Sequence, residues 1–229
     1  MGRPPRITEP GLAYHVLNRR VMRLPLFLKD DDYLAFERVL AKSLSRPDAP
    51  RLLAWCLMPN HWHLVVHAGH QTDLSAWMQW VTVTHTHRWH AHTHTTGEGP
   101  LYQGRFKSFP IQTDDHFLAA CRYVEANAKR ANLVKRAERW RWASLWTRRR
   151  SGSELKRWAQ RWPVSRPRNW LAQVNGSMDE ESLAAVRRSV TRGVPLGAES
   201  WRARIAHRLG LDITLRPRGR PRKEPENSS

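Results

Sequence analysis

The sequence is poor in several features that mark other classes of protein. It contains two cysteines in 229 residues, Cys56 and Cys121, which form no CxxC pair, so neither a disulfide framework nor a thiolate metal site is indicated. No apolar run approaches the roughly 20 residues that a membrane-spanning helix needs. No apolar stretch follows the basic first residues, as it would in a signal peptide. We therefore expect a cytoplasmic protein with reduced thiols.

Acidic residues are also scarce. The chain has 20 Asp and Glu against 39 Lys and Arg, which leaves a formal net charge of +19 and a pI of about 11.3. Such an excess makes a polyanion the expected partner, with nucleic acid as the first candidate and a membrane surface as the second. We take nucleic acid as the partner and expect no membrane partner.

The hydrophobic pattern predicts four strands and three long helices before residue 135. Pro59 and Asn60 mark a turn between two apolar strands, which predicts a hairpin. The order of elements is β-α-β-β-α-β-α, which is typical of an α+β fold with a ferredoxin-like antiparallel sheet and helices on one face. The strands are expected in residues 13–19, 51–58, 61–68 and 101–112, and the helices in residues 30–44, 73–91 and 113–134.

Two histidines interrupt the apolar stretch CLMPNHWHLVVHA. Residues i and i+2 of a strand point to the same face, so His61 and His63 should lie about 6.6 Å apart on one face, where they can converge on a metal ion. His67 shares that face but lies about 13 Å beyond His63, too far to join them. The alternative is a pair of hydrogen-bonded histidines without a metal.

The His-hydrophobic-His stretch MPNHWHLVV resembles the motif of the HUH endonucleases, and the chain more narrowly resembles the IS200-like, single-tyrosine transposases of the REP-associated kind. The segments GPLYQGRFKSFPI, YVEANAKRANLV and WRWAS and the terminal RGRPRK are similar to the general pattern of that family. The resemblance implies that Tyr123 is the nucleophile and that His61, His63 and Asn127 hold Mg²⁺ or Mn²⁺. Ala128 stands where many relatives have proline, which changes how the helix bends without removing a reactive group.

The same resemblance implies a substrate and a place in the cell. It predicts that the substrate is single-stranded DNA that folds into a hairpin, as in REP repeats, and that no small molecule is a substrate. It also predicts a 5′-phosphotyrosine intermediate. The location it predicts is the bacterial nucleoid. The family that the chain resembles includes monomers that act in cis and homodimers that donate the tyrosine helix in trans, so the oligomeric state stays open.

The choice of Tyr123 also has a basis in chemistry. An enzyme that cuts and rejoins DNA without ATP must store the phosphodiester energy in a covalent bond, and a tyrosine phenolate can form one. Among the four tyrosines, Tyr14 and Tyr102 fall on predicted strands and Tyr33 falls on the apolar stripe of the first helix. Tyr123 has Asn127 one helical turn later, on the same face. Tyr102 is the next candidate.

After residue 134 the composition becomes rich in arginine and tryptophan. We expect residues 1–150 to form the catalytic domain, residues 151–215 a basic helical extension that binds DNA, and residues 216–229 a disordered tail. Most of the tryptophans should pack in the core, and some beside arginine could stack on bases. The RGRP in the tail is similar to an AT-hook, for which a solubilising basic tail is the alternative. The predicted DNA contacts are Arg105, Lys107, Arg130, Arg139, Arg141, Arg148, Arg149, Arg150, Arg218 and Arg220.

Two other functions and one other site remain open. The chain could be a non-catalytic DNA-binding protein descended from a transposase, or a replication initiator or relaxase that uses the same chemistry. Five more histidines lie between residues 85 and 94. Their i, i+2 spacing suits a metal poorly on a helix, so we expect a solvated helix end rather than a second metal site.

Overall fold

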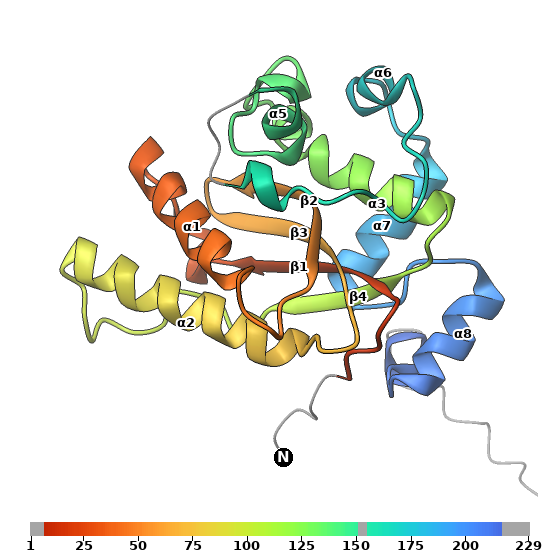
Figure 1. Ribbon diagram of the computed structural model, residues 1–229, viewed down its shortest axis with the longest axis horizontal. Coiled ribbons are helices and arrows are strands. Elements are labelled where there is room, and N and C mark those ends of the chain that lie inside the picture. Colours follow the sequence, from red (N-terminus) through yellow and green to blue (C-terminus); the bar gives the residue numbers. More distant parts are fainter. Residues whose placement is uncertain (1–6, 151–154, 217–229) are drawn as a thin grey trace, which may run out of the picture.

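A computed structural model of the chain describes residues 7–150 and 155–216. Four antiparallel strands form one sheet in the order β2-β3-β1-β4 (Figure 1). The predicted ferredoxin-like sheet is thereby confirmed, and so is the hairpin across Pro59 and Asn60. The strands are β1 (Ala13–Arg19), β2 (Arg51–Met58), β3 (His61–His67) and β4 (Lys107–Ile111).

The register of β3 decides which side chains reach the site. Its neighbour β1 runs antiparallel to it, with Arg19 opposite His61 and Leu17 opposite His63. On its other side, β2 pairs Met58 with His61, and the register shifts by one residue at a bulge around Leu53. The His61 end of β3 therefore lies beside the C-terminal ends of both neighbouring strands.

Two helices cover one face of the sheet, namely α1 (Asp30–Ser43) and α2 (Leu74–Thr93). The acidic first turn of α1 suits the helix dipole. Asp73 caps α2 by accepting hydrogen bonds from the backbone N–H groups of the next turn. Trp62 of β3, Phe36 of α1 and Trp77 of α2 are fully buried in the hydrophobic core between these helices and the sheet.

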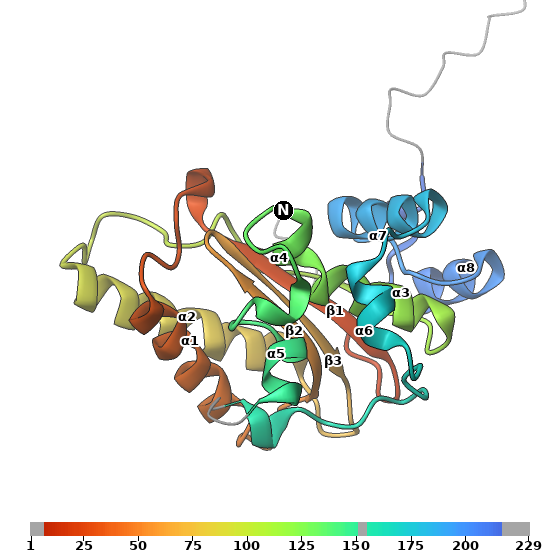
Figure 2. The same cartoon turned by 90° about the horizontal axis from the view of Figure 1, so that it is seen from above.

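The opposite face is covered by a second helical layer, and Figure 2 shows the sheet between the two layers. Its central helix is α3 (Asp115–Glu125), which contributes Phe117, Cys121 and Val124 to a second hydrophobic core. The predicted helices on one face correspond to α1 and α2, and the helix that carries Tyr123 adds a layer to the other face. The remaining helices are α4 (Asn127–Arg130), α5 (Ser144–Arg149), α6 (Trp170–Asn175), α7 (Glu180–Arg192) and α8 (Glu199–Arg208).

Residues after 134 cover both edges of the sheet. Trp142 accepts a hydrogen bond from the backbone N–H of Leu57 on β2, at 2.9 Å. At the other edge, the backbone of Leu196 exchanges hydrogen bonds with β4 residues and their neighbours. Leu155 belongs to the first core, and Trp170 and Leu196 belong to the second. The division near residue 150 stays a prediction, but side chains from both parts fill the same cores.

Three tryptophans after residue 134 pack against the rest of the fold, as predicted for most of the tryptophans. Trp142 stacks on Tyr33 with ring centroids 4.6 Å apart, and the Trp140 and Trp162 indoles each donate to a carbonyl of β2, at 2.8 Å. No helix in the described parts of the chain is both long enough and apolar enough to span a bilayer.

Candidate active site and nucleic-acid interface

The two histidines of β3 meet on one face of the sheet, as predicted. The rings of His61 and His63 lie with their centroids 5.0 Å apart at an interplanar angle of 85°. His63 is buried, whereas His61 is half-buried at the start of the strand. Nδ1 of His61 lies 2.6 Å from Oδ1 of Asn60, so its N–H donates to that carbonyl and Nε2 is left as the atom that can bind an ion.

A third histidine, missed in the sequence, joins this pair. His15 of β1 is fully buried, and its Nε2 lies 2.8 Å from Nδ1 of His63. A metal-binding histidine needs one unprotonated nitrogen. For His63 to use Nε2, its Nδ1 must carry the proton and donate it to His15. His15 then carries its own proton on Nδ1, which has no partner among the described residues. His15 therefore orients the ring of His63.

Burial keeps these imidazoles neutral. Desolvation lowers the pKa of His15 to about 3. It also lowers the pKa of His61 to about 4, with the positive charges of Arg19 and Arg130 adding to the effect. The pKa of His63 is lowered for the same first reason. Neutral imidazole is the form that coordinates a metal, so all three rings are in that form at neutral pH.

Tyr123 lies against the histidines from the second helical layer. Its ring centroid is 6.0 Å from that of His63 and 6.3 Å from that of His15, with near-perpendicular and edge-on geometry. Tyr123 is 9% exposed, so the ring is largely buried between these neighbours. The guanidinium carbon of Arg130 lies 3.9 Å from the Tyr123 ring centroid. Tyr123 therefore contacts His63, His15 and Arg130.

The expected long helix is interrupted between Tyr123 and Asn127. α3 ends at Glu125 and α4 begins at Asn127, with Ala126 between them at φ −84° and ψ 0°. Arg130 donates to the backbone carbonyl of Tyr123 at 3.0 Å and to Oδ1 of Asn127 at 3.1 Å. The arginine thereby ties the nucleophile candidate and the amide ligand candidate into one unit.

Glu125 anchors this helix from behind. Its buried carboxylate accepts hydrogen bonds from the Ser144 hydroxyl at 2.5 Å and from the Trp170 indole N–H at 2.7 Å. Burial raises the pKa of this carboxyl, and the two donors oppose that rise. Residues from the C-terminal segment thus fix the position of Tyr123, two residues away.

The donor set fits a hard divalent ion with open positions. His61 and His63 each offer Nε2, and Asn127 offers its amide oxygen, while the buried Nδ2 of the same amide has no partner among the described residues. The described parts of the chain contain no group of three or more His, Cys, Asp or Glu side chains arranged to hold an ion. The candidate set is two imidazoles and one amide, which leaves room for substrate oxygens.

The other tyrosines lie elsewhere. Tyr14, Tyr33 and Tyr102 are buried in the first core, across the sheet from the histidine pair. The Tyr102 hydroxyl accepts a hydrogen bond from the Trp62 indole at 3.1 Å and lies 2.7 Å from Nδ1 of His85. Tyr102 is therefore a poor second candidate for the nucleophile. His85, in the histidine-rich run, is buried in this network, while its neighbours toward residue 94 lie at the expected exposed helix end.

A basic groove opens beside the histidine end of the sheet. Its cavity of about 560 Å³ is lined by four cationic residues, Arg19, Arg23, Arg105 and Lys107, with Thr191 of α7 on its other side. Arg19 lies directly opposite His61 in the β1–β3 register. This cavity, hereafter the basic groove, therefore lies next to His61 and holds two of the predicted DNA contacts.

Arg130, another predicted DNA contact, lies on the Tyr123 ring, and the remaining seven fall into three groups. Arg139, Arg149 and Arg150 are exposed, and Arg141 is exposed but paired with Asp30 at 3.2 Å. Arg148 is half-buried and donates to three backbone carbonyls, among them that of Leu53 at 2.6 Å, so its role in the structure is to brace the fold. Arg218 and Arg220 lie outside the described residues, as does most of the predicted tail.

Comparisons with known proteins identify the family and the fold. The sequence model of the family "Transposase IS200 like" matches residues 8–127, just over half of the chain. No curated protein matches the chain significantly. The solved structure of a REP-associated tyrosine transposase bound to a REP hairpin shares the fold, with a TM-score of 0.52 and 20% identity over 63% of this chain and 82% of that one. A proposed transposase from Deinococcus radiodurans R1 aligns with a TM-score of 0.39 and 18% identity over 52% of this chain and 91% of that one. The matched region carries His15, the histidine pair, Tyr123 and Asn127, and the chain belongs to the IS200-like transposase family.

Proposed function

We propose that the chain is a metal-dependent transposase that cleaves and rejoins single-stranded DNA at hairpin-forming, REP-like repeats through a 5′-phosphotyrosine intermediate. The observation that carries the proposal is the contact of Tyr123 with His63 on one side and Arg130 on the other. A nucleophile, an ion-binding pair and a fixed positive charge lie within one small volume. This combination is what a phosphoryl transfer to tyrosine requires.

The residues divide the work of cleavage among them. The basic groove holds the phosphates on one side of the scissile bond, and Arg130 holds the scissile phosphate beside the tyrosine. The Tyr123 hydroxyl oxygen attacks the phosphorus, the bond from phosphorus to the 3′ oxygen breaks, and the leaving 3′ oxygen takes a proton to become a hydroxyl. The phenolic proton passes to solvent.

The ion site is proposed at Nε2 of His61, Nε2 of His63 and the amide oxygen of Asn127. A bound Mg²⁺ or Mn²⁺ supplies Lewis-acid polarisation of the phosphate there. His15 and Asn60 hold the two imidazoles in the tautomer that presents Nε2. Arg130 donates to the same amide oxygen of Asn127 in the structure, so Asn127 would share that oxygen between the guanidinium and a bound ion.

The phosphotyrosine conserves the energy of the broken phosphodiester. A 3′-hydroxyl of a second strand can therefore attack it and restore a DNA backbone without ATP. Tyr123 and His63 meet within one chain, which supports cleavage in cis over a homodimer that exchanges its tyrosine helix.

The hairpin substrate is proposed on two grounds. The structural neighbour was solved with a REP hairpin, although at 20% identity it shows the fold alone. The basic groove and the exposed arginines supply contacts to the phosphates of such a strand. We propose a nucleoid-associated location in the cytoplasm on the basis of the DNA substrate.

A cleavage assay with a labelled hairpin oligonucleotide tests the proposal. The hairpin is enriched from a pool with randomised single-stranded flanks, and Mg²⁺ or Mn²⁺ is added. Wild-type protein should yield a protein–DNA adduct that survives a denaturing gel, and Tyr123→Phe should yield none. Tyr33→Phe is the matched control, because its hydroxyl lies across the sheet, and it should form the adduct at the wild-type rate.

A DNA-binding protein without catalytic activity is the rival from another functional class. It predicts tight hairpin binding with no adduct and no free 3′-hydroxyl product for wild-type protein in either metal. That result would remove the transposase proposal and leave the groove as a binding site.

A further inference from the structure

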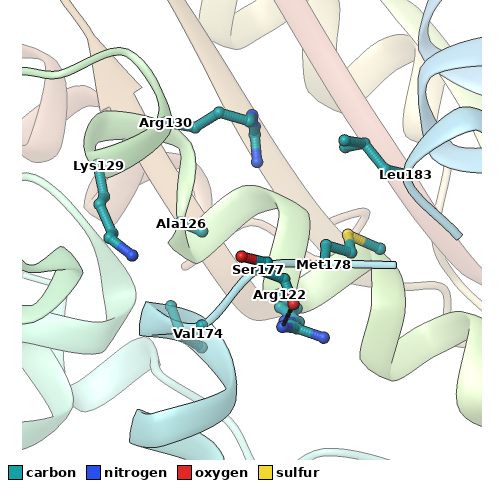
Figure 3. Close-up of a pocket in the computed structure, with 9 residues that line it drawn as sticks. Arg122, Ala126, Lys129, Arg130, Val174, Ser177, Met178 and Leu183 are labelled. Atoms are coloured by element: carbon teal, nitrogen blue, oxygen red, sulfur yellow. Dashed lines mark hydrogen bonds between the residues drawn. The ribbon is translucent and has the colours of Figure 1, made fainter. Parts of the chain in front are cut away.

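A second cavity lies beside the helix that carries Tyr123. It has a volume of about 280 Å³ and is enclosed by α3, α4, the end of α6 and the start of α7. Figure 3 shows the lining side chains arranged around Ala126, with Lys129 and Arg130 reaching in from α4 and Leu183 from α7. We call this cavity the helix pocket.

The helix pocket and the nucleophile occupy neighbouring stripes of one helical segment. Tyr123, Asn127 and Arg130 follow the i, i+4, i+7 spacing of one stripe, and Arg122, Ala126 and Lys129 follow the same spacing on the next. Arg130 belongs to both places, because it stacks on Tyr123 and also lines the pocket. A ligand in the pocket is therefore one side chain away from the attacked phosphate.

The pocket combines positive charge with apolar walls. Arg122, Lys129 and Arg130 line it, and none of them lies within salt-bridge distance of a carboxylate in the described parts of the chain. Arg122 donates to the carbonyl of Ser177 at 2.5 Å, and Lys129 donates to the carbonyl of Asn175, so both cations are held in place by neutral carbonyl oxygens. Nε of Arg122 is buried and has no partner among the described residues.

The opposite walls are apolar. Val174, Met178 and Leu183 come from the C-terminal segment, and Ala126 forms the floor. Asp179 caps α7, where its carboxylate accepts from the N–H of Ser182 at 2.7 Å, and this carboxylate also interacts electrostatically with Arg122 without reaching salt-bridge distance. Aliphatic walls beside three cationic side chains match a nucleotide, whose base has apolar faces and whose phosphate is anionic.

The volume of the helix pocket and its position relative to the basic groove indicate which part of the DNA it can bind. Small-molecule cavities begin at about 300 Å³, so this volume takes one base and not a base pair. α7 lines the helix pocket with Leu183 and the basic groove with Val190 and Thr191. These positions are about 10 Å apart along the helix, at 1.5 Å per residue. A single strand can therefore run from the groove, past Tyr123, into the pocket.

We infer that the helix pocket binds the unpaired nucleotide next to the phosphate that Tyr123 attacks, with the base against Met178 and Leu183 and its phosphate on Arg122 and Lys129. The inference rests on the proposed function and deepens it. It assigns the C-terminal segment a direct part in choosing the cleavage position. An unpaired nucleotide must be extruded to enter, so the pocket would select single strand over duplex.

An abasic scan of the flank tests the inference. The probe is the hairpin oligonucleotide of the cleavage assay, with each flank nucleotide replaced in turn by an abasic residue, and binding is measured in the Tyr123→Phe background to prevent turnover. One position should weaken binding by about tenfold or more, because an abasic residue has no base to pack against Met178 and Leu183. In Ala126→Phe, which fills the pocket, the intact probe should bind about tenfold more weakly than to the unfilled protein, and the abasic replacement should cost less than about twofold.

Two further variants guard against misfolding. Met178→Trp fills the same pocket from a loop, so it should reproduce the result if Ala126→Phe does not fold. Ala184→Phe makes the matched change on the exposed face of α7, and it should leave the whole scan unchanged. A flat scan, or an abasic penalty of equal size in filled and unfilled proteins, overturns the inference. Because this assay reads binding only, an absent covalent adduct would reject the proposed function while leaving the scan to decide on the pocket.

Discussion

Replacing His15 with phenylalanine should separate metal binding from folding. Phenylalanine keeps a ring of similar size in a site packed against Phe109, whose centroid lies 4.9 Å away. The variant removes the hydrogen bond between His15 and His63. The wild-type protein already has one buried unpartnered nitrogen here, Nδ1 of His15. The variant exchanges it for Nδ1 of His63, so the free energy of unfolding should change by less than about 1 kcal/mol.

Metal affinity should respond differently. Loss of a hydrogen bond that orients a ligand histidine typically costs about 10- to 100-fold in metal affinity, which corresponds to roughly 1.4–2.7 kcal/mol. Without His15 as acceptor, the proton of His63 is no longer held on Nδ1, and the tautomer that blocks Nε2 gains population. Cleavage at low Mn²⁺ should fall by the same factor and recover in part when the ion is raised to saturation.

Two measurements on His15→Phe separate an effect on metal affinity from an effect on stability. Mn²⁺ titration followed by electron paramagnetic resonance gives the affinity, and denaturant unfolding gives the stability. His67→Phe is the matched control, since it makes the same change near the other end of β3, and it should bind Mn²⁺ as the wild-type protein does. Unchanged Mn²⁺ affinity in His15→Phe, or a loss of stability that accounts for the whole effect, would refute the reasoning.

The free energy of unfolding should also fall as the pH drops below 6.5. Burial lowers the pKa of His61 to about 4 in the folded chain. Between these two pH values the unfolded chain therefore binds a proton that the folded chain does not. Each such histidine costs about 1.4 kcal/mol per pH unit in that window, so a Tm that is the same at about pH 7 and about pH 5 would contradict the burial argument. Trp170→Phe removes one of the two donors to the buried Glu125 carboxylate and should destabilise the fold by about 1–3 kcal/mol in denaturant unfolding, whereas an unchanged midpoint would show that water replaces the indole. Exchanging Arg105 and Lys107 together for glutamine should reduce the slope of log affinity against log salt by about 1.4 for single-stranded DNA, and an unchanged slope would place the strand outside the basic groove.

The sequence predicted the sheet, its hairpin and the shared face of His61 and His63, because these depend on local periodicity. His15 was missed because its contact with His63 depends on the pairing of β1 with β3, which the period-2 pattern does not specify. One signal was present: His15 shares a strand face with Ala13 and Leu17, both of which belong to the second core. Knowledge that β1 lies next to β3 would have placed it beside the histidine pair.

In the C-terminal segment, composition did not predict which side chains contact the rest of the fold. Its tryptophans and arginines predicted a DNA-binding extension, which stays a prediction. The structure adds that Arg148 donates to the carbonyl of Leu53 on β2 and that Trp170 donates to Glu125 of the helix that carries Tyr123. Composition cannot distinguish an arginine that faces a phosphate from one that donates to backbone carbonyls. The helix pocket was beyond prediction for a related reason, since its walls come from residues 122–130 and 174–183, which meet only in the folded chain.

Mapping the covalent bond by tandem mass spectrometry tests the central claim most directly. Wild-type protein is incubated with the enriched hairpin and Mn²⁺, the DNA is digested to a single nucleotide, and the peptides are sequenced. The account predicts a nucleotide 5′-phosphate on the hydroxyl of Tyr123. A phosphodiester on Tyr102 or on any other residue, or cleaved DNA without any modified peptide, would contradict it.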